Sequence, residues 1–304
     1  MSDFPNLFYY TDFETFKLIL EHGTLRFKES TKSNDKLDTN ILYAELKELF
    51  NERYGADKSK SSQMQFLIGF FENTGYQNNS VPVVACFTEK DDSRLLWDAY
   101  TMHRADRKAE RYNGVCIKFN EEQIYNAMQK ECDEEDIFLV SNIKYNKEAR
   151  REYLNGCLDK FDREVEKLSK DPNQSQDVIP ERTIMFPSGR RGIAYKLKKC
   201  IVYPMMRFLQ NLQLTSPLFK HEFWKEEMEI RALFSKRVDK LNVLSDGAHY
   251  YDVHITNDCI DKTILGPEFT DNDLADLKRQ NNVIDVDLLI LEKSVGTGVI
   301  TSDN

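Results

Sequence analysis

The segment LFYYTDFETFKLILEHGTLRF, residues 7–27, decides the fold of this chain. Its first five residues form a short apolar strand that ends in hydroxyls and aromatic rings, and a helix begins directly after them. The spacing of Thr11 and Glu14 predicts a capping box at the helix start. Gly23 predicts a left-handed cap at the helix end. A strand end held by a capped helix is a suitable place for a ligand pocket.

The rest of the segment fits a strand, a helix and a second strand. The apolar face of the helix consists of Phe13, Phe16, Ile19 and Leu20. Residues 24–27 then have the pattern of a strand. The simpler alternative is that Tyr9 and Tyr10 are ordinary strand aromatics and that Thr11 is only a cap. These residues alone favour that alternative.

Composition limits the classes of protein to consider. The chain has 304 residues, of which 40% are hydrophobic and 31% charged, as in a soluble protein with a substantial core. Its net charge of −9 argues against duplex DNA as a partner for the whole surface. No apolar run reaches membrane-spanning length, and the N-terminus lacks the pattern of a secretory signal. We therefore expect a cytoplasmic protein without a membrane partner.

The cysteines and histidines give no sign of a metal site. None of the six cysteines belongs to a CxxC pair, and several lie in apolar runs, so we interpret them as reduced core thiols. They are Cys86, Cys116, Cys132, Cys157, Cys200 and Cys259. The five histidines include no HExxH motif. We therefore expect no metal cofactor.

Strands and helices alternate along the chain. Apolar runs predict strands at 81–88, 114–119, 142–145, 229–234, 249–256, 259–265 and 283–291. Helical patterns predict helices at 95–102, 121–131, 147–170, 190–212 and 271–281, the last capped by Thr270. No repeat or clear boundary is visible. We expect a single domain over 1–304, with helical insertions at about 36–80 and 146–225.

A second informative segment is HEFWKEEMEIRALF, residues 221–234. A strand that begins at Glu227 places Glu227, Glu229 and Arg231 on one face. Two carboxylates at a strand end can divide the work of a catalyst, because one can bind a sugar hydroxyl while the other orients or deprotonates a nucleophile. The alternative is a solvated charged face or a surface ion pair, and the motif alone favours it.

Eight motifs in order resemble a bacterial family catalogued as domain of unknown function 2971. They are FYYT at 8–11, ILEHGTLRF at 19–27, Asn34-Asp35, CFTE at 86–89, LLWDAY at 95–100, GVCIKF at 114–119, KHEFWKEEMEIR at 220–231 and ILGP at 264–267. The resemblance spans most of the chain. The family pattern has His at the position of Tyr9 and Trp at the position of Ile230.

The opening of that family is similar in turn to the start of ADP-ribosyltransferase domains of the poly(ADP-ribose) polymerase and RNA 2′-phosphotransferase type. Residues 7–11 and 19–23 fall on the shared pattern with the same spacing. This resemblance implies an α+β fold with a split, mostly antiparallel sheet and a helical insertion. It also implies that NAD is the substrate and is held by three positions that are often His, Tyr and Glu. Tyr9, Tyr100 and Glu229 take these positions, with Glu227 placed as in transferases of the ExE type.

The implied chemistry is cleavage of the bond between nicotinamide and ribose. A carboxylate on the ribose 2′-OH stabilises the oxocarbenium-like transition state, and we expect Glu229 in this role, with Glu227 beside it. Aromatic rings stack on nicotinamide, hydroxyls bind ribose and a guanidinium contacts the diphosphate. The expected NAD-binding residues are Tyr9, Tyr10, Thr11, Arg26, Thr88 and Tyr100. We expect Tyr9, Thr11, Thr88 and Glu229 to line one pocket.

The expected function is NAD-dependent ADP-ribosyl transfer or NAD hydrolysis, as in a bacterial toxin or defence effector. The acceptor is an unidentified protein or nucleic acid, and a regulatory partner protein is compatible with this role. The alternative is a non-catalytic nucleotide-binding or protein-interaction module on the same fold, because Tyr9 replaces the usual His. A phosphotransferase that acts on nucleic acid fits the acidic balance less well. Basic runs at 103–111, 189–191 and 196–199 fit solvated helix faces or, together, a guide for a nucleotide substrate.

Overall fold

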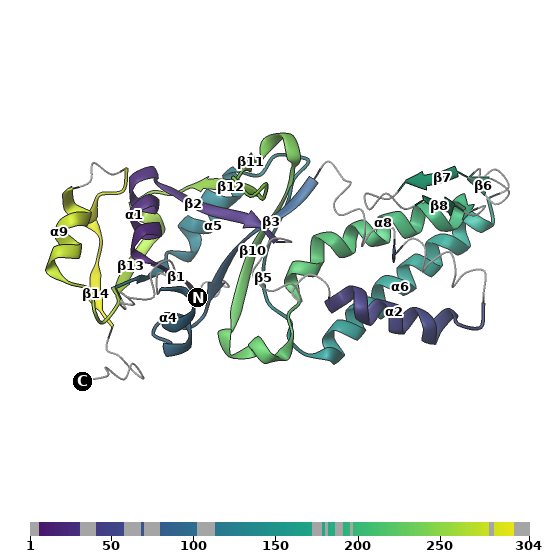
Figure 1. Cartoon of the computed structure of the whole chain (residues 1–304), viewed down its shortest axis with the longest axis horizontal. Helices are drawn as coiled ribbons and strands as arrows, with labels where there is room; N and C mark the ends of the chain where they lie inside the picture. Colours follow the sequence, from purple (N-terminus) through teal and green to yellow (C-terminus); the bar gives the residue numbers. More distant parts are fainter. Residues whose placement is uncertain are drawn as a thin grey trace.

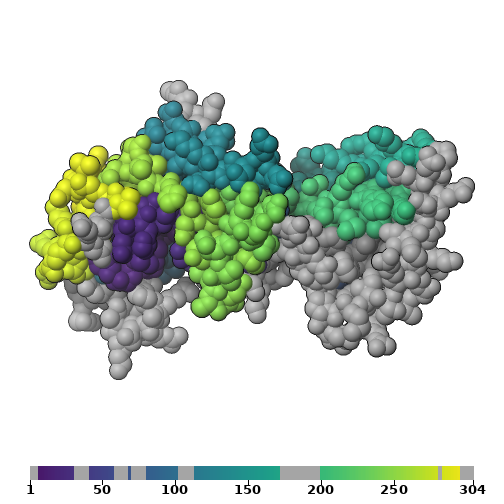
Figure 2. All heavy atoms as spheres, turned by 90° about the horizontal axis from the view of Figure 1, so that it is seen from above, coloured from purple at the N-terminus to yellow at the C-terminus, as the bar shows by residue number. Residues whose placement is uncertain are grey.

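A large sheet and a separate group of helices make up the part of the chain that the structure describes (Figure 1). This computed structural model describes residues 6–30, 41–57, 68–69, 80–101, 113–171, 178–179, 182–185, 191–194, 197–279 and 283–294. The sheet lobe holds all ten strands of the large sheet, and the helical lobe holds the three longest helices (Figure 1). Figure 2 shows the two lobes side by side, with residues 147–169 and 199–215 in the helical one.

The large sheet is mostly antiparallel, which confirms the predicted α+β class. Its strands are β1 (Leu7–Thr11), β2 (Thr24–Glu29), β3 (Ser80–Thr88), β4 (Val115–Phe119), β5 (Ile137–Asn142), β10 (Glu229–Arg237), β11 (Asn242–Val243), β12 (His249–His254), β13 (Ile260–Leu265) and β14 (Leu291–Lys293). The main path runs β11-β12-β2-β3-β1-β4-β13-β14. Strand β10 joins β3 and β5, and only β13 and β14 pair in parallel.

Strand β3 is the branch point of the sheet. Strand β10 pairs with β3 over its whole length, from Ser80 to Thr88. The opposite edge of β3 is divided between β2, which pairs at Val83 and Val84, and β1, which pairs at Thr88. Because one strand edge accepts only one neighbour at each residue, β1 and β2 diverge from each other here. In the described part of the chain, residues 85–87 have no strand partner on this edge.

Most predicted helices are present. The α-helices are α1 (Phe13–His22), α2 (Ile41–Tyr54), α4 (Arg94–Tyr100), α5 (Glu121–Lys130), α6 (Lys147–Ser169), α8 (Lys199–Thr215) and α9 (Asp271–Arg279). The short 3-10 helices are η2 (Ser216–Leu218), η3 (Glu222–Glu227), η4 (Val238–Lys240), η5 (Asn257–Cys259) and η6 (Val286–Leu288). Helix α2 lies within 36–80, and α6 and α8 lie within 146–225, the two segments where we expected helical insertions.

The cap of α1 differs from the prediction. Asp12, rather than Thr11, caps the helix, and its Oδ1 accepts a hydrogen bond of 2.8 Å from the Thr15 N–H. Thr11 remains the last residue of β1 and pairs with Val115. Because the Asp12 carboxylate accepts from the free N–H of the first helical turn, Thr11 is not needed as the cap and stays paired in β1. The predicted stop at Gly23 is confirmed, because this residue is left-handed and its N–H donates to the Ile19 carbonyl.

Three further elements were predicted wrongly. The strand expected at 142–145 ends at Asn142, because the run that pairs with β10 begins at Ile137. The helix expected at 190–212 begins only at Lys199, since residues 191–194 and 197–198 form β8 and β9. These short strands pair with β7 (Arg182–Met185) and β6 (Val178–Ile179). The strand expected at 283–291 is mostly the turn η6, and only Leu291–Lys293 pairs with β13.

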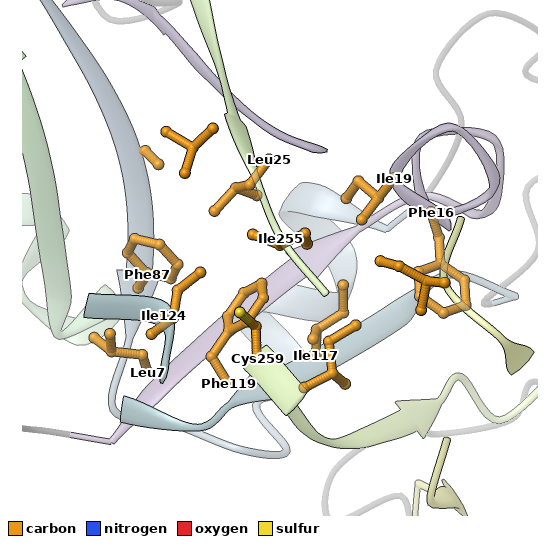
Figure 3. Close-up of a cluster of buried hydrophobic side chains, with 14 of the residues drawn as sticks. Leu7, Phe16, Ile19, Leu25, Phe87, Ile117, Phe119, Ile124, Ile255 and Cys259 are labelled. Atoms are coloured by element: carbon orange, nitrogen blue, oxygen red, sulfur yellow. The ribbon is translucent and has the colours of Figure 1, made fainter. Parts of the chain in front are cut away.

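The main core lies between α1, α5 and one face of the sheet. Phe16, Ile19 and Leu20 on α1 are buried, as their spacing predicted, and Phe87 and Phe119 of the sheet belong to the same buried cluster (Figure 3). Each such side chain contributes about 1.5–3 kcal/mol by leaving water. A second core within the helical lobe consists of residues from α2, α6 and α8, including Leu46, Leu158, Leu209 and Leu212.

A substitution of Gly23 tests the left-handed end of α1 and its close packing against the neighbouring segments. Its φ is 59°, and a Cβ there would lie 2.7 Å from Val283 Cγ1 and 3.2 Å from the Ile255 carbonyl oxygen. We expect Gly23→Ala to lower the free energy of unfolding by about 1–3 kcal/mol, measured by urea denaturation. Gly156→Ala is the matched control, because it lies in α6 with open space around it. This control should be neutral or stabilising by up to about 1 kcal/mol. Equal effects at both positions would contradict the account.

Candidate functional site

The two predicted carboxylates lie on either side of a break in the backbone. Glu227 is the last residue of η3, Met228 is left-handed with φ 45°, and β10 begins only at Glu229. The predicted strand start at Glu227 is therefore wrong, since a left-handed residue interrupts the pleat. The two carboxylates still converge, because Lys220 Nζ lies 2.6 Å from Glu227 Oε2 and 3.2 Å from Glu229 Oε2.

Arg231 completes this group of charges. Its Nε donates to Glu229 Oε1 at 2.6 Å, and its Nη2 donates to Oε2 at 3.2 Å. Its Nη1 donates to the Pro217 carbonyl at 2.6 Å. We call Lys220, Glu227, Glu229 and Arg231 the charge cluster. Each of the four residues is at most 5% exposed, and their formal charges sum to zero. Such a set is tolerated in an interior because every charge is paired.

The cations set the ionisation of Glu229. Burial by itself raises the pKa of this carboxyl, but Arg231 and Lys220 outweigh the effect of burial and lower the pKa to about 2. Glu229 is therefore ionised at neutral pH and is a weak base. Its chemistry is that of a fixed negative charge and hydrogen-bond acceptor rather than that of a proton carrier.

Three hydroxyls surround the carboxylates. Tyr100 donates to Glu227 Oε1 at 3.1 Å, and Thr88 donates to the Glu227 carbonyl at 2.7 Å. The Tyr145 hydroxyl accepts from the Glu229 N–H at 2.9 Å. Burial raises the pKa of Tyr145 to about 12, and burial followed by Glu227 raises the pKa of Tyr100. Both phenols are therefore neutral at physiological pH, so Tyr100 can donate to Glu227 while Tyr145 accepts from Glu229.

An accessible thiol adjoins the charge cluster. Cys86 pairs in register with Arg231, so both side chains lie on the same face of the sheet. The thiol keeps accessible surface, yet desolvation by the surrounding protein, followed by the charge of Glu229, raises its pKa. From this combination we infer that the Cys86 thiol lies in a recess. Cys86 also belongs to the part of β3 where β1 and β2 diverge.

Tyr9 extends this recess along β1. Its ring packs on Phe87 and Phe119 at centroid distances of 6.0 and 6.5 Å, and the side chain remains partly accessible. Burial, followed by Cys86, raises the pKa of Tyr9 to about 12, while Arg26 lowers it. The hydroxyl therefore lies within electrostatic range of Cys86 and of Arg26. We call the region bordered by Tyr9, Cys86 and Glu229 the recess.

The structure brings some predicted site residues together. Glu227, Glu229, Thr88 and Tyr100 are joined by direct contacts or strand pairing, and Tyr9 adjoins them through Cys86. Of the four residues that we expected to line one pocket, Thr88 and Glu229 are paired across β3 and β10, Tyr9 lies within electrostatic range of Cys86, and Thr11 lies apart. This residue is buried beside Val115, three positions beyond the pairing of Phe8 with Thr88.

Two other residues that we predicted to bind NAD, Tyr10 and Arg26, make contacts within the protein instead. The Tyr10 hydroxyl accepts from the Ser93 N–H at 2.9 Å, and its ring packs edge-on against Trp97 at 5.1 Å. Arg26 forms a two-bond ion pair with Asp252, at 2.8 and 2.9 Å, and stacks on the Tyr250 ring. A stacked ring or a diphosphate must compete with these contacts.

Sequence reasoning missed several members of the site. Tyr145 holds the Glu229 backbone from a segment far from β10, and no local pattern marks it. Lys220 is the first residue of the motif KHEFWKEEMEIR, but the motif assigned it no role beside Glu229. Cys86 lies in the motif CFTE, which gives a family resemblance but no role for the thiol. The basic run at 103–111 and the motif Asn34-Asp35 lie outside the described residues, as do the side chains of 189–191.

No metal site is found within the described ranges, where no group of three or more His, Cys, Asp and Glu residues could hold an ion. The six cysteines are free thiols. None of the helices in the described part combines the length and apolar character needed to cross a bilayer.

The fold and the site define an α+β protein with a buried pair of carboxylates at the start of a sheet strand. The model of the family described as "Protein of unknown function (DUF2971)" matches residues 96–232. The chain is similar to this family over that segment, which contains the charge cluster and two of the predicted motifs, GVCIKF and KHEFWKEEMEIR, in full. No curated protein and no solved structure matches the chain. The similarity to ADP-ribosyltransferases stays a prediction.

The low pKa of Glu229 makes stability depend on pH. The folded-state pKa of about 2 lies below the ordinary 4.5, so the ionised group stabilises the fold above about pH 4.5. This contribution, roughly 3 kcal/mol, is lost as pH falls towards 2. We expect urea unfolding to show a large stability difference between wild type and Glu229→Gln at pH 6 that shrinks at pH 3. A difference that does not change with pH would contradict the assignment.

Proposed function

We propose that the recess binds a nucleotide of the NAD type and that Glu229 supports cleavage of the bond between nicotinamide and ribose. The observation that carries this proposal is an ionised carboxylate, fixed at the start of β10, beside the accessible Cys86 and Tyr9. A preorganised negative charge stabilises the oxocarbenium-like transition state of this cleavage. The products would be nicotinamide together with an ADP-ribosylated acceptor or, where water is the acceptor, free ADP-ribose.

One oxygen of Glu229 suits the ribose better than the other. Oε1 receives the short bond from Arg231 Nε at 2.6 Å, while Lys220 and Arg231 each contact Oε2 at 3.2 Å. A ribose hydroxyl therefore competes most easily for Oε2. In this arrangement Arg231 keeps the carboxylate oriented while the substrate binds.

Glu227 and Tyr100 form the second half of the proposed site. Glu227 accepts from Tyr100 through one oxygen and from Lys220 through the other. Tyr100 is 44% exposed, so its ring has a free face for a nicotinamide or for a group of the acceptor. We assign Glu227 the orientation of the acceptor, which is a protein or a nucleic acid. A bacterial enzyme of this kind would act as a toxin or defence effector.

A second candidate is a module that binds a nucleotide without cleaving it. Both oxygens of Glu229 are already engaged by cations, and the charge cluster as a whole is neutral. Tyr9 also differs from His in reach and in donor geometry. These features favour binding without turnover, and the two candidates differ in whether nicotinamide is released.

Nicotinamide release separates the two candidates. On incubation with NAD and cell extract, we expect release from the wild type and a loss of at least about 100-fold in Glu229→Gln, because the fixed charge is removed. Glu226→Gln is the matched control, since that neighbouring side chain is 68% exposed and lies outside the charge cluster. Saturable NAD binding without release would support the binding module. Absence of NAD binding would contradict both candidates.

Glu227 tests the division of work between the carboxylates. We expect Glu227→Ala to reduce transfer to the acceptor more than it reduces NAD hydrolysis, because Glu229 keeps Arg231 and Lys220 in this variant. The two rates are measured in parallel with radiolabelled NAD. Equal loss of both rates would show that Glu227 supports the whole site, and no loss of either would remove it from the mechanism.

A further inference from the structure

A buried arginine of the helical lobe connects that lobe to the charge cluster. Arg150 lies in the first turns of α6 and is 4% exposed. Its Nε donates to Glu45 Oε1, on α2, at 2.7 Å. Its Nη1 donates to two carbonyl oxygens, that of Tyr145 at 2.6 Å and that of Lys220 at 3.0 Å. One guanidinium thus connects α6 to α2 and to two backbone positions outside the helices.

These two backbone positions belong to the residues that hold Glu229. The Tyr145 hydroxyl accepts from the Glu229 N–H, and Lys220 Nζ bonds both Glu229 and Glu227. The same two segments meet again where the Lys220 N–H donates to the Lys144 carbonyl at 3.2 Å. Because Arg150 binds the carbonyl groups of Tyr145 and Lys220, it fixes the backbone that carries these two side chains.

We propose that Arg150 is a positioning residue through which the packing of the helical lobe sets the geometry of the charge cluster. Planar guanidinium is suited to this role, because its donors point in fixed directions towards Glu45 and the two carbonyls. The significance of the inference for catalysis rests on the proposed function. The positioning of Lys220 and Tyr145 by Arg150 does not depend on the proposed function, and it can be tested without NAD.

Trp224 provides a local reporter of Lys220. Its ring lies 5.0 Å from Lys220 Nζ, whereas the other tryptophan, Trp97 on α4, is buried against β1, β4 and β13. The protein labelled with 5-fluorotryptophan should give two ¹⁹F resonances, which Trp224→Phe assigns. Trp97 then reports the integrity of the sheet lobe, and Trp224 reports the position of Lys220.

The test compares Arg150→Lys and Arg150→Gln with Glu45→Gln. Arg150→Lys keeps the charge beside Glu45 but loses the planar fork. Glu45→Gln is the matched control, because it removes the same ion pair and leaves the bonds from Arg150 to the two carbonyls. We expect the Trp224 resonance to shift or broaden by more than its linewidth in both Arg150 variants and to stay in place in Glu45→Gln. The Trp97 resonance should stay unchanged in all three.

An unchanged Trp224 resonance in Arg150→Lys and Arg150→Gln would overturn the proposal and leave Arg150 with a role in stability alone. An equal change in Glu45→Gln would also overturn it, since the ion pair would then be the cause. If the Trp97 resonance disappears in Arg150→Gln because that variant unfolds, the Trp224 resonance of Arg150→Lys alone decides whether the proposal holds. Loss of nicotinamide release from every variant and the wild type alike would contradict the proposed function but not this inference.

Discussion

The contact of Lys220 with both Glu227 and Glu229 is the interaction on which the site depends. A single ammonium holds two carboxylates that a break in the backbone would otherwise separate. Arg231 balances the second negative charge, so four buried ions form a neutral set. Removing one member would leave an unpaired charge in the interior, at a cost of about 3–5 kcal/mol. The left-handed Met228 turns Glu227 back towards Glu229. The ion pairs of Lys220 with both carboxylates hold the backbone in this uncommon conformation.

The second constraint is the divided edge of β3. Strand β10 occupies one edge fully, and β1 and β2 share the other. The charge cluster therefore lies at the edge of β3 that pairs with β10 along its whole length. Cys86 and Tyr9 border the other edge, where β1 and β2 diverge. This topology puts an ionised carboxylate next to an accessible recess in an otherwise well-packed sheet. The helical lobe adds Lys220, Tyr145 and Arg150 from its base, and so contributes to a site that the sheet alone does not complete.

Local sequence patterns predicted the elements better than the site. The segment 7–27 predicted β1, α1 and β2, together with the buried face and the left-handed cap at Gly23, because these depend on neighbours within a few residues. The cap itself was misplaced, since both Thr11 and Asp12 carry suitable oxygens and only the strand pairing of Thr11 distinguishes them. Glu229 was recognised as a candidate, but its pKa depends on Lys220 and its backbone on Tyr145, which lies 84 residues away. Contacts of this kind follow from the sheet topology and leave no local periodicity in the chain.

The most direct test of the central claim is whether NAD occupies the recess. Cys86 is the accessible thiol of the recess, and the rate at which N-ethylmaleimide modifies it can be followed by mass spectrometry. The reaction is run at about pH 9, because the raised pKa of Cys86 slows it at neutral pH. Cys132, a partly accessible thiol at the end of α5, serves as the internal reference. We predict that saturating NAD slows the modification of Cys86 and leaves that of Cys132 unchanged. Equal rates for Cys86 with and without NAD would contradict the account.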